Sequence, residues 1–267
     1  MKTMRISCKD FNLAATLESG QVFGFVKDGE TYEGRISGKP VKLRQTSGVL
    51  HATAAVGVVR DYFDLDRDLT SLFDLLETEP GLAKTLPVFR GLRIIRQDSW
   101  EALACFILSS NNNVKRIQGI YKNLVEYFST FPSATQIAKS HERILRQLGL
   151  GYRAPFLLRT AQFLSTNPHY LEAVRGEGYE AARARVLAFP GIGPKVADCA
   201  LLYGFQRLDA FPVDVWILRA MRKLYFRNRS VSEDKIRTFG MKRWGAHAGY
   251  IQQYLFHAAR NGILVRL

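Results

Sequence analysis

The spacing of apolar residues changes along this chain, and that change limits the folds open to it. Residues 1–55 contain short β-rich segments, such as Thr31–Ile36 and Val41–Gln45, separated by turns that carry glycine. From about Leu69 onward the period becomes helical, and Pro and Gly divide this part into several helices. The sequence therefore predicts an α+β fold, with a small N-terminal antiparallel sheet packed on a mostly helical body.

We expect the sheet domain to span residues 1–82 and the helical body residues 83–267. Two capping-box patterns predict helix starts in the body, Asp98-Ser-Trp-Glu101 and Ser230-Val-Ser-Glu233. Three widely separated cysteines, Cys8, Cys105 and Cys199, are too few for a four-thiolate iron–sulfur cluster and lack zinc spacing. No apolar run is long enough to span a membrane, so we expect an intracellular protein with no membrane partner.

The positive charge of the chain is concentrated in the helical part. Residues 1–80 carry 10 Lys and Arg against 12 Asp and Glu, whereas residues 81–267 carry 28 against 12, a net of +16. A folded cationic segment of this size is typical of polyanion binders, and it favours nucleic acid over a generally basic surface. The charge is spread over many predicted helices, which argues against binding to a membrane surface.

A glycine-rich turn between two predicted helices is the most informative segment. The helix Glu180–Ala188 runs into Pro190-Gly-Ile-Gly193, and a second helix begins near Pro194. Two glycines two residues apart leave backbone N–H groups uncovered beside a helix N-terminus, which favours phosphate binding. An ordinary turn between two helices is the alternative interpretation.

Lys195 and Asp214 are the candidate catalytic residues. An amine at a helix start can serve as a nucleophile once it is neutral, although lysines beside such turns also contact phosphates. Asp214 follows Phe211-Pro-Val213 and stands where a helix N-cap belongs, and capping alone would explain it. The pairing of the two residues favours catalysis.

Together with that pairing, motifs spread over residues 10–260 resemble the 8-oxoguanine DNA glycosylase family of the helix-hairpin-helix superfamily. The similar segments are Ser19-Gly-Gln-Val-Phe23, Asp61–Asp66, Leu92–Asp98, Ser109–Asn113, Leu148–Arg153, Trp244–Gly249, and Gln252 with Phe256. The resemblance implies a bifunctional glycosylase and lyase that flips oxidised guanine from duplex DNA during base excision repair. It also implies a DNA-associated monomer, in the cytoplasm and nucleoid of a prokaryote or the nucleus of a eukaryote.

The resemblance gives further residues their expected roles. Phe256 and Cys199 would cover the two faces of the flipped base, Gln252 would read its Watson–Crick edge, and the Gly20 carbonyl would accept the N7 hydrogen. The remaining expected DNA contacts are Asn111, Arg116, Tyr152, Arg153, Gly191 and Gly193. Considered one by one, Cys199 and Phe256 would instead be core, Gln252 helix surface, Asn111 a polar loop, and Tyr152 and Arg153 a surface turn.

By the same resemblance, Lys195 attacks the sugar and Asp214 stabilises the cationic sugar and the Schiff base that follows. No cofactor is required, but backbone carbonyls of Leu187, Phe189 and Ile192 are where family members hold a structural cation. Two positions depart from the family pattern, with Trp216 in place of a histidine and Ala259 in place of an acidic residue. Two rivals stay open, a helix-hairpin-helix glycosylase for another base and a non-catalytic DNA-binding module.

Overall fold

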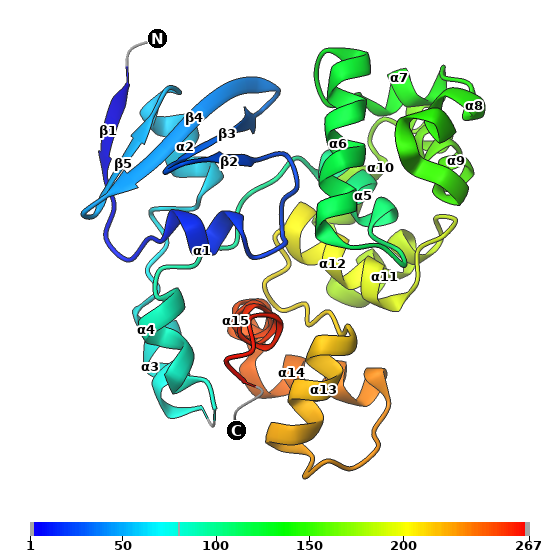
Figure 1. Cartoon of the computed structure of the whole chain (residues 1–267). Coiled ribbons are helices and arrows are strands. Elements are labelled where there is room, and N and C mark those ends of the chain that lie inside the picture. Colours follow the sequence, from blue (N-terminus) through cyan, green and yellow to red (C-terminus); the bar gives the residue numbers. More distant parts are fainter. Residues whose placement is uncertain (1–2, 80, 265–267) are drawn as a thin grey trace. The chain divides into compact units, whose positions relative to one another are not determined.

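The computed structural model describes residues 3–79 and 81–264, which fold into two compact units (Figure 1). The first unit combines residues 1–96 with 208–267, and the second comprises residues 97–207. The predicted boundary between a sheet domain of residues 1–82 and a helical body of residues 83–267 stays a prediction. The compact units cut the chain differently, because the last helices belong with the N-terminal part.

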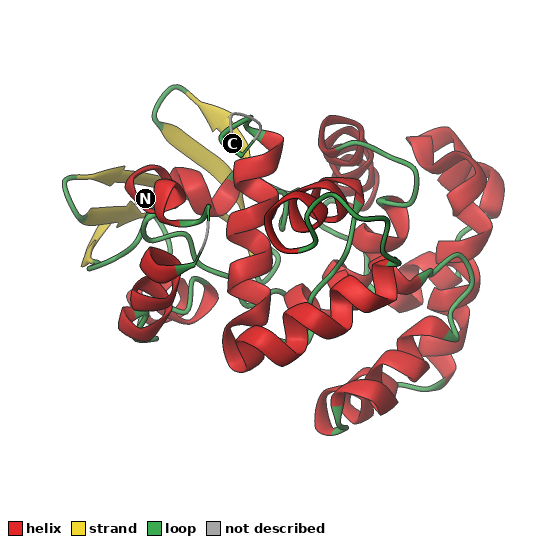
Figure 2. Ribbon diagram, turned by 90° about the horizontal axis from the view of Figure 1, so that it is seen from below, coloured by secondary structure: helices red, strands yellow, loops and turns green. Residues whose placement is uncertain are grey.

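The strands, which are yellow in Figure 2, form one five-stranded antiparallel sheet in the first unit. Their order across the sheet is β1-β5-β4-β3-β2. Type I′-like turns join Thr31–Ile36 to Lys39–Thr46 and Lys39–Thr46 to Val49–Ala52, since Ser37 and Gly38, and also Ser47 and Gly48, have positive φ angles. The strands are β1 (Met4–Ser7), β2 (Val26–Asp28), β3 (Thr31–Ile36), β4 (Lys39–Thr46) and β5 (Val49–Ala52). The expected α+β class with an antiparallel sheet is thereby confirmed.

The remaining elements of the first unit are helices. They are α1 (Leu13–Leu17), α2 (Val56–Tyr62), α3 (Thr70–Thr78), α4 (Leu86–Phe89), α13 (Val215–Tyr225), α14 (Glu233–Trp244) and α15 (Ala248–Arg260), with short 3₁₀ segments at Ala83–Thr85 and Gly245–His247. Helix α1 lies inside the stretch expected to be entirely β, because Asn12 caps it by accepting from the Ala15 N–H at 2.9 Å. Helical structure also begins before Leu69, at α2.

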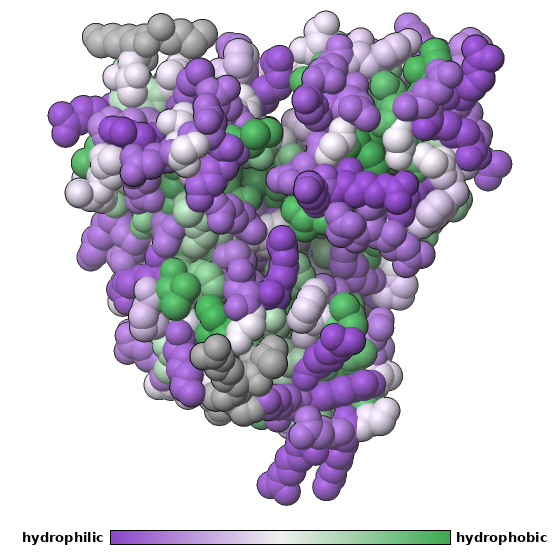
Figure 3. Space-filling view, in the orientation of Figure 1, coloured by the Kyte–Doolittle hydropathy of each residue, from purple (hydrophilic) through white to green (hydrophobic). Residues whose placement is uncertain are grey.

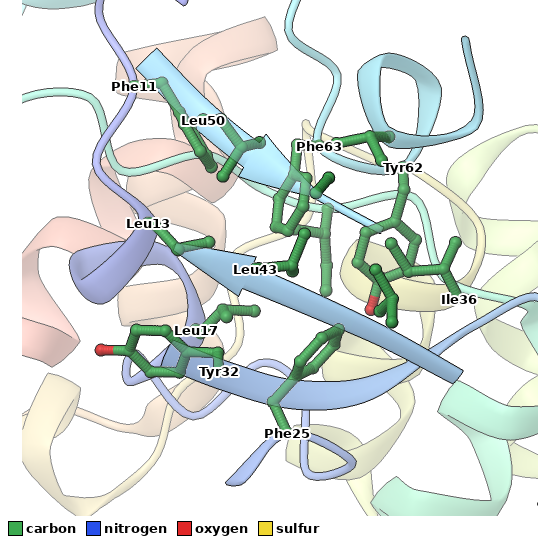
Figure 4. Packing of buried hydrophobic residues seen from close by; sticks show 14 of the residues in the cluster. Phe11, Leu13, Leu17, Phe25, Tyr32, Ile36, Leu43, Leu50, Tyr62 and Phe63 are labelled. Carbon is green, nitrogen blue, oxygen red and sulfur yellow. The ribbon is translucent and has the colours of Figure 1, made fainter. Parts of the chain in front are cut away.

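The core of the sheet is formed by one of its faces together with α1, α2 and the residue that follows α2 (Figure 4). Leu13 and Leu17 of α1 and Tyr62 and Phe63 at the end of α2 are buried against strand residues such as Leu43. This cluster fixes the position of the segment after α1, which carries Gly20.

Buried polar contacts join the C-terminal helices to the N-terminal half of the first unit. The Glu79 carboxylate accepts from the Tyr225 hydroxyl at 2.9 Å, and from Arg243 Nε and Trp244 Nε1, each at 3.0 Å. The Tyr254 hydroxyl donates to the Phe89 carbonyl at 3.0 Å. These contacts explain why residues 208–267 cluster with residues 1–96 in the first unit.

The second unit is helical throughout its secondary structure. Its elements are α5 (Ser99–Leu108), α6 (Val114–Phe128), α7 (Ala134–Ala138), α8 (Glu142–Leu145), α9 (Ala154–Thr166), α10 (Tyr170–Gly176), α11 (Tyr179–Leu187) and α12 (Pro194–Gly204), with a π segment at Arg146–Leu150 and a 3₁₀ segment at Gly151–Arg153. Asp98 caps α5 as predicted, accepting from the Glu101 N–H at 2.9 Å. The Glu101 carboxylate instead accepts from the Tyr121 hydroxyl at 2.8 Å.

The predicted cap of the later helix is off by two residues. Ser232, not Ser230, is the N-cap of α14, and it accepts from the Lys235 N–H at 3.2 Å. Both serines suit a capping position, and the fold of the preceding connection selects the second. No helix within residues 3–79 and 81–264 is both long and apolar enough to cross a membrane.

Candidate active site

Helices α11 and α12 and the turn between them form the predicted helix-hairpin-helix. The turn is anchored by the buried side chains of Phe189 and Ile192, and the Ile192 N–H donates to the Phe189 carbonyl at 3.3 Å. Gly193 is the N-cap of α12 in an extended conformation, and Pro194 is the first helical residue. This is the arrangement predicted from the glycine and proline spacing.

The two glycines of the hairpin meet different surroundings. Gly191 has a φ of +77°, and a Cβ built there would lie 2.3 Å from Cδ2 of Phe156 in α9. A Cβ built on Gly193 has no heavy atom within 4 Å. Glycine is therefore strongly favoured at position 191, whereas the surroundings of Gly193 leave its backbone open to a ligand.

Lys195 is the second residue of α12 and is half-buried. Its Nζ lies 5.9 Å from the ring centroid of Phe106 in α5, and this ring is stacked on Tyr203 of α12 at 5.2 Å. Cys199, one turn further along α12, is buried and lies on the same helix face as Lys195. The amine therefore projects from the hairpin over an aromatic surface.

A buried ion pair that the sequence motifs did not single out fixes α12 against α11. Asp198 is 1% exposed, and it accepts from Arg183 Nε and from the Tyr179 hydroxyl, each at 2.7 Å. Since Asp198 is three residues after Lys195, this pair holds the helix that carries the amine. The only signal in the sequence was an acidic residue within an otherwise apolar helix.

The loop between α5 and α6 gathers three of the expected DNA contacts. Asn111 is exposed with a φ of +46°, and the Tyr152 hydroxyl donates to the carbonyl of Ser110 at 3.1 Å. Arg153 donates to the Ser110 carbonyl at 2.8 Å through Nε and to the Asn111 carbonyl at 2.9 Å through Nη2, and its guanidinium lies 4.3 Å from the Tyr152 ring. Ser110 lies within the motif Ser109–Asn113, but the sequence motifs assigned it no role, and the structure shows that its carbonyl anchors both Tyr152 and Arg153.

The two arginines differ in exposure. Arg153 is 2% exposed, so the alternative of a surface turn does not hold for it. Arg116 is exposed in the first turn of α6, which begins where Asn113 accepts from the Arg116 N–H at 2.9 Å. Arg116 projects into solvent while Arg153 supports the loop from within.

In the first unit, Asp214 is the N-cap of α13, as predicted. One carboxylate oxygen accepts from the N–H groups of Trp216 at 3.0 Å and Ile217 at 2.8 Å. A negatively charged side chain at this position is also complementary to the dipole of the helix. Trp216, at the position where the family commonly has histidine, lies 5.9 Å from the guanidinium of Arg219.

The same unit brings Gly20 to the helix that carries Gln252 and Phe256. Gln253 of α15 donates through Nε2 to the Ser19 carbonyl at 3.0 Å, and Gly20 follows with a φ of +80°. Gln252 is only 4% exposed, so it is not the helix-surface residue of the alternative interpretation. Phe256 is partly exposed one turn further along, on the same face of α15.

The segment around Gly20 is held by Gln21. The Gln21 side chain donates to the Arg93 carbonyl at 2.8 Å and accepts from the Ile95 N–H at 3.0 Å. This explains in physical terms why a glutamine follows the glycine. The expected site residues therefore divide between the units, with Gly20, Asp214, Gln252 and Phe256 in the first and the others in the second.

Among the residues that the structure describes, no group of three His, Cys, Asp or Glu side chains is placed so that it could hold a metal ion. The cation expected at Leu187, Phe189 and Ile192 would use backbone carbonyls and stays a prediction. 

Comparison with known proteins agrees with the hairpin and the sheet. Residues 3–103 match the 8-oxoguanine DNA glycosylase N-terminal domain, and residues 104–246 match the HhH-GPD superfamily of base excision DNA repair proteins. A probable N-glycosylase/DNA lyase of Methanothermobacter thermautotrophicus is 33% identical, with 99% of this chain and 98% of that protein covered.

Two solved structures are similar over nearly their whole length. One is MBOgg1 in complex with a low-affinity DNA ligand, at 30% identity and a TM-score of 0.91, with 98% of this chain and 99% of that chain covered. The other is the Clostridium acetobutylicum 8-oxoguanine glycosylase/lyase with DNA containing cytosine opposite 8-oxoguanine, at 29% identity and a TM-score of 0.90, covering 98% of each chain. The chain therefore belongs to the 8-oxoguanine DNA glycosylase family, within the HhH-GPD superfamily of base excision DNA repair proteins.

Proposed function

We propose that this protein excises 8-oxoguanine opposite cytosine from duplex DNA and then cleaves the abasic strand as a lyase. The observation that carries the proposal is Lys195 at the start of the hairpin's second helix, in a chain that also holds Asp214 as an N-cap. The relatives named N-glycosylase/DNA lyase and 8-oxoguanine glycosylase/lyase support it.

In the proposed mechanism, neutral Lys195 attacks C1′ of the flipped nucleotide. The N–C1′ bond forms while the glycosidic bond breaks, and the departing base takes a proton. Ionised Asp214 stabilises the positive charge on the sugar and on the Schiff base, which then permits β-elimination of the 3′ phosphate. The Phe106 ring beneath the amine provides a partly apolar surrounding for this nucleophile.

We assign base recognition to Gly20 and to helix α15 of the first unit, together with Cys199. The Gly20 carbonyl accepts the N7 hydrogen that oxidised guanine has and guanine lacks, Gln252 reads the Watson–Crick edge, and Phe256 and Cys199 cover the two faces. The Gln253 contact to Ser19 supports this assignment, because it ties the Gly20 segment to the helix that carries two of these side chains.

The estranged cytosine is assigned to the loop after α5 and to its neighbours. Asn111 and Tyr152 fill the vacated position in the stack, and the cytosine edge is the expected target of the two arginines, Arg116 and Arg153. Because Arg153 is buried on two backbone carbonyls, we assign direct donation to Arg116 and support of the Asn111 loop to Arg153. The N–H groups of Gly191 and Gly193 contact phosphate.

A structural cation in the hairpin would be held by the carbonyls of Leu187, Phe189 and Ile192. Carbonyl oxygens suit hard cations, and the buried side chains of Phe189 and Ile192 fix the turn that carries them. Such an ion would reinforce phosphate binding and take no part in the chemistry.

Borohydride trapping tests the proposed chemistry. We expect the parent to form a covalent adduct on 8-oxoguanine:cytosine duplex, Lys195→Gln to lose it, and the exposed-lysine control Lys139→Gln to keep it. Asp214→Asn retains an oxygen for the helix cap but removes the charge, so it separates capping from catalysis. A larger adduct on oxidised pyrimidine would favour a different glycosylase, and an adduct with Lys195→Gln would refute the nucleophile.

A further inference from the structure

Helices α13 and α14 and their connection carry an excess of positive charge. Between residues 219 and 243 there are nine Lys and Arg against two Asp and Glu. Some of these cations are structural, since Arg237 pairs with Asp234 at 2.9 Å and Arg243 pairs with Glu79 at 3.0 Å. Five others define what we call the basic corner, namely Lys223, Arg227, Arg229, Lys235 and Lys242.

All five side chains of the basic corner are exposed, and none forms an ion pair with another residue in the described part of the chain. The sheet region of the same unit is different, because residues 1–80 carry 12 Asp and Glu against 10 Lys and Arg, and several of these cations are paired. Lys27 pairs with Glu18 at 2.8 Å, and Lys42 and Arg67 also pair with carboxylates. The positive field of the first unit is therefore concentrated at the corner.

The corner stands on a fixed scaffold. The Arg222 guanidinium donates to the Val231 carbonyl at 2.8 Å, and the Asn228 N–H donates to the Arg222 carbonyl at 2.8 Å. Phe239 of α14 packs against Phe226 at 5.1 Å between ring centroids. In the region where Figure 1 draws this connection, Figure 3 shows hydrophilic side chains at the surface.

Helix stability does not account for these charges. Lys223 and Lys242 lie in the last turns of their helices, where cations are favoured by the helix dipole. Lys235, however, lies in the first turn of α14, where a cation is disfavoured. Arg227 has a φ of +49°, an uncommon conformation for a residue with a side chain. These two residues are placed against local preference, which points to a ligand.

The corner also lacks the apolar centre of a protein interface. The large apolar side chains that are exposed in the described residues are Val26, Val58, Val88, Tyr127, Tyr152, Phe163 and Val215, and none lies within residues 223–242. Protein interfaces bury aromatic and apolar residues at their centre, whereas a phosphate backbone requires only cations. The chemistry of the corner therefore fits DNA better than an acidic protein.

We propose that the basic corner is a second DNA-binding surface, which contacts duplex phosphates without reading sequence. It lies at the C-terminal end of α13, about 16 Å along the helix from Asp214 at the other end, given a rise of about 1.5 Å per residue. This proposal rests on the proposed function only because both take DNA as the ligand. Its role is to hold duplex remote from the reacting nucleotide during lesion search.

The test compares two triple variants with equal loss of charge. Arg227→Gln, Arg229→Gln and Lys235→Gln remove part of the corner, and Arg5→Gln, Lys9→Gln and Lys39→Gln remove three exposed cations near the sheet. Binding to undamaged duplex is measured from 50 to 300 mM salt. We expect the corner variant to lower the slope of log affinity against log salt by about 2–3, since each phosphate contributes about 0.9. The sheet variant should change it by less than one contact.

Single-turnover excision under saturating protein separates this surface from the catalytic site. We expect both variants to excise at the parent rate, because the corner does not touch the reacting nucleotide. Equal slopes for the two variants would overturn the proposal. Binding to polyglutamate, which stands for an acidic protein, is measured in parallel. If the corner variant loses polyglutamate binding while its slope on duplex stays unchanged, the proposal is also wrong. Failure of the parent to form a borohydride adduct would instead count against the proposed function, because duplex binding is measured without it.

Discussion

Replacing Gly191 with alanine tests whether the hairpin is held by the packing described above. Two separate costs arise from the structure. A φ of +77° disfavours any residue with a Cβ by about 1–2 kcal/mol, and the new Cβ would lie 2.3 Å from Cδ2 and 2.7 Å from Cγ of Phe156. Normal carbon contacts lie near 3.5–4 Å, so the ring must shift, and such overpacking costs about 1–3 kcal/mol.

The expected sum is about 2–5 kcal/mol, a large part of the roughly 5–15 kcal/mol that stabilises a typical domain. Gly193→Ala is the matched control, because it adds the same methyl group two residues later with no heavy atom within 4 Å and no positive φ. We expect its free energy of unfolding to stay within about 0.5 kcal/mol of the parent. It should nevertheless weaken duplex binding, since the methyl partly covers the exposed turn.

Urea unfolding followed by fluorescence and circular dichroism measures the stability of each variant. The double variant Gly191→Ala with Phe156→Ala relieves the overlap but keeps the unfavourable φ, so the cycle should show coupling of about 1–3 kcal/mol. If Gly191→Ala and Gly193→Ala unfold at the same urea concentration, the packing argument is wrong. If the cycle shows no coupling, the Phe156 ring is not the obstacle.

Three further predictions concern the second unit. Asp198→Asn should keep an acceptor for Tyr179 but leave the Arg183 guanidinium without its buried negative charge, so unfolding should become easier by about 3–5 kcal/mol, measured by urea titration. Burial raises the pKa of Glu101 to about 7, although the hydrogen bond from Tyr121 lowers it. Because this pKa is higher in the folded than in the unfolded protein, the parent loses stability as pH rises from about 4.5 through 7. Glu101→Gln cannot ionise, and its stability relative to the parent should therefore increase between pH 5 and 8, whereas a constant difference would contradict the assignment. Arg116→Ala should reduce the preference for cytosine over adenine opposite the lesion by about tenfold or more, while Arg153→Ala should slow both duplexes alike in single-turnover excision.

The hairpin and the Asp214 cap could be predicted from sequence because both are decided by residues close together in the chain. Gly191, Gly193 and Pro194 specify the turn and the helix start, and the side chain of Asp214 reaches N–H groups only two and three residues later. Five-residue α1 was missed for a related reason. Its one clear signal is the cap at Asn12, and too few residues follow to show a helical period.

Burial of the polar site residues could not be predicted, because it depends on contacts between distant segments. Arg153 reaches carbonyls 42 and 43 residues earlier, and Gln253 reaches the Ser19 carbonyl across 234 residues. The assignment of residues 208–267 to the first unit has the same origin, since Glu79 is paired with residues of α13 and α14. A motif identifies which side chain stands at a position, but its environment is set by the fold.

Arg116 and Arg153 show how the environment of a residue, and not only its identity, affects specificity. The resemblance assigns both arginines to the estranged cytosine, yet only Arg116 is exposed, whereas Arg153 already donates to two backbone carbonyls. Withdrawing Arg153 from those carbonyls would give up hydrogen bonds made by a charged group, which are worth about 1.5–3 kcal/mol each. That cost is comparable to the discrimination a good base contact provides, so a direct role for Arg153 would gain little. Its contribution is better made through Asn111, whose positive-φ backbone it holds in place.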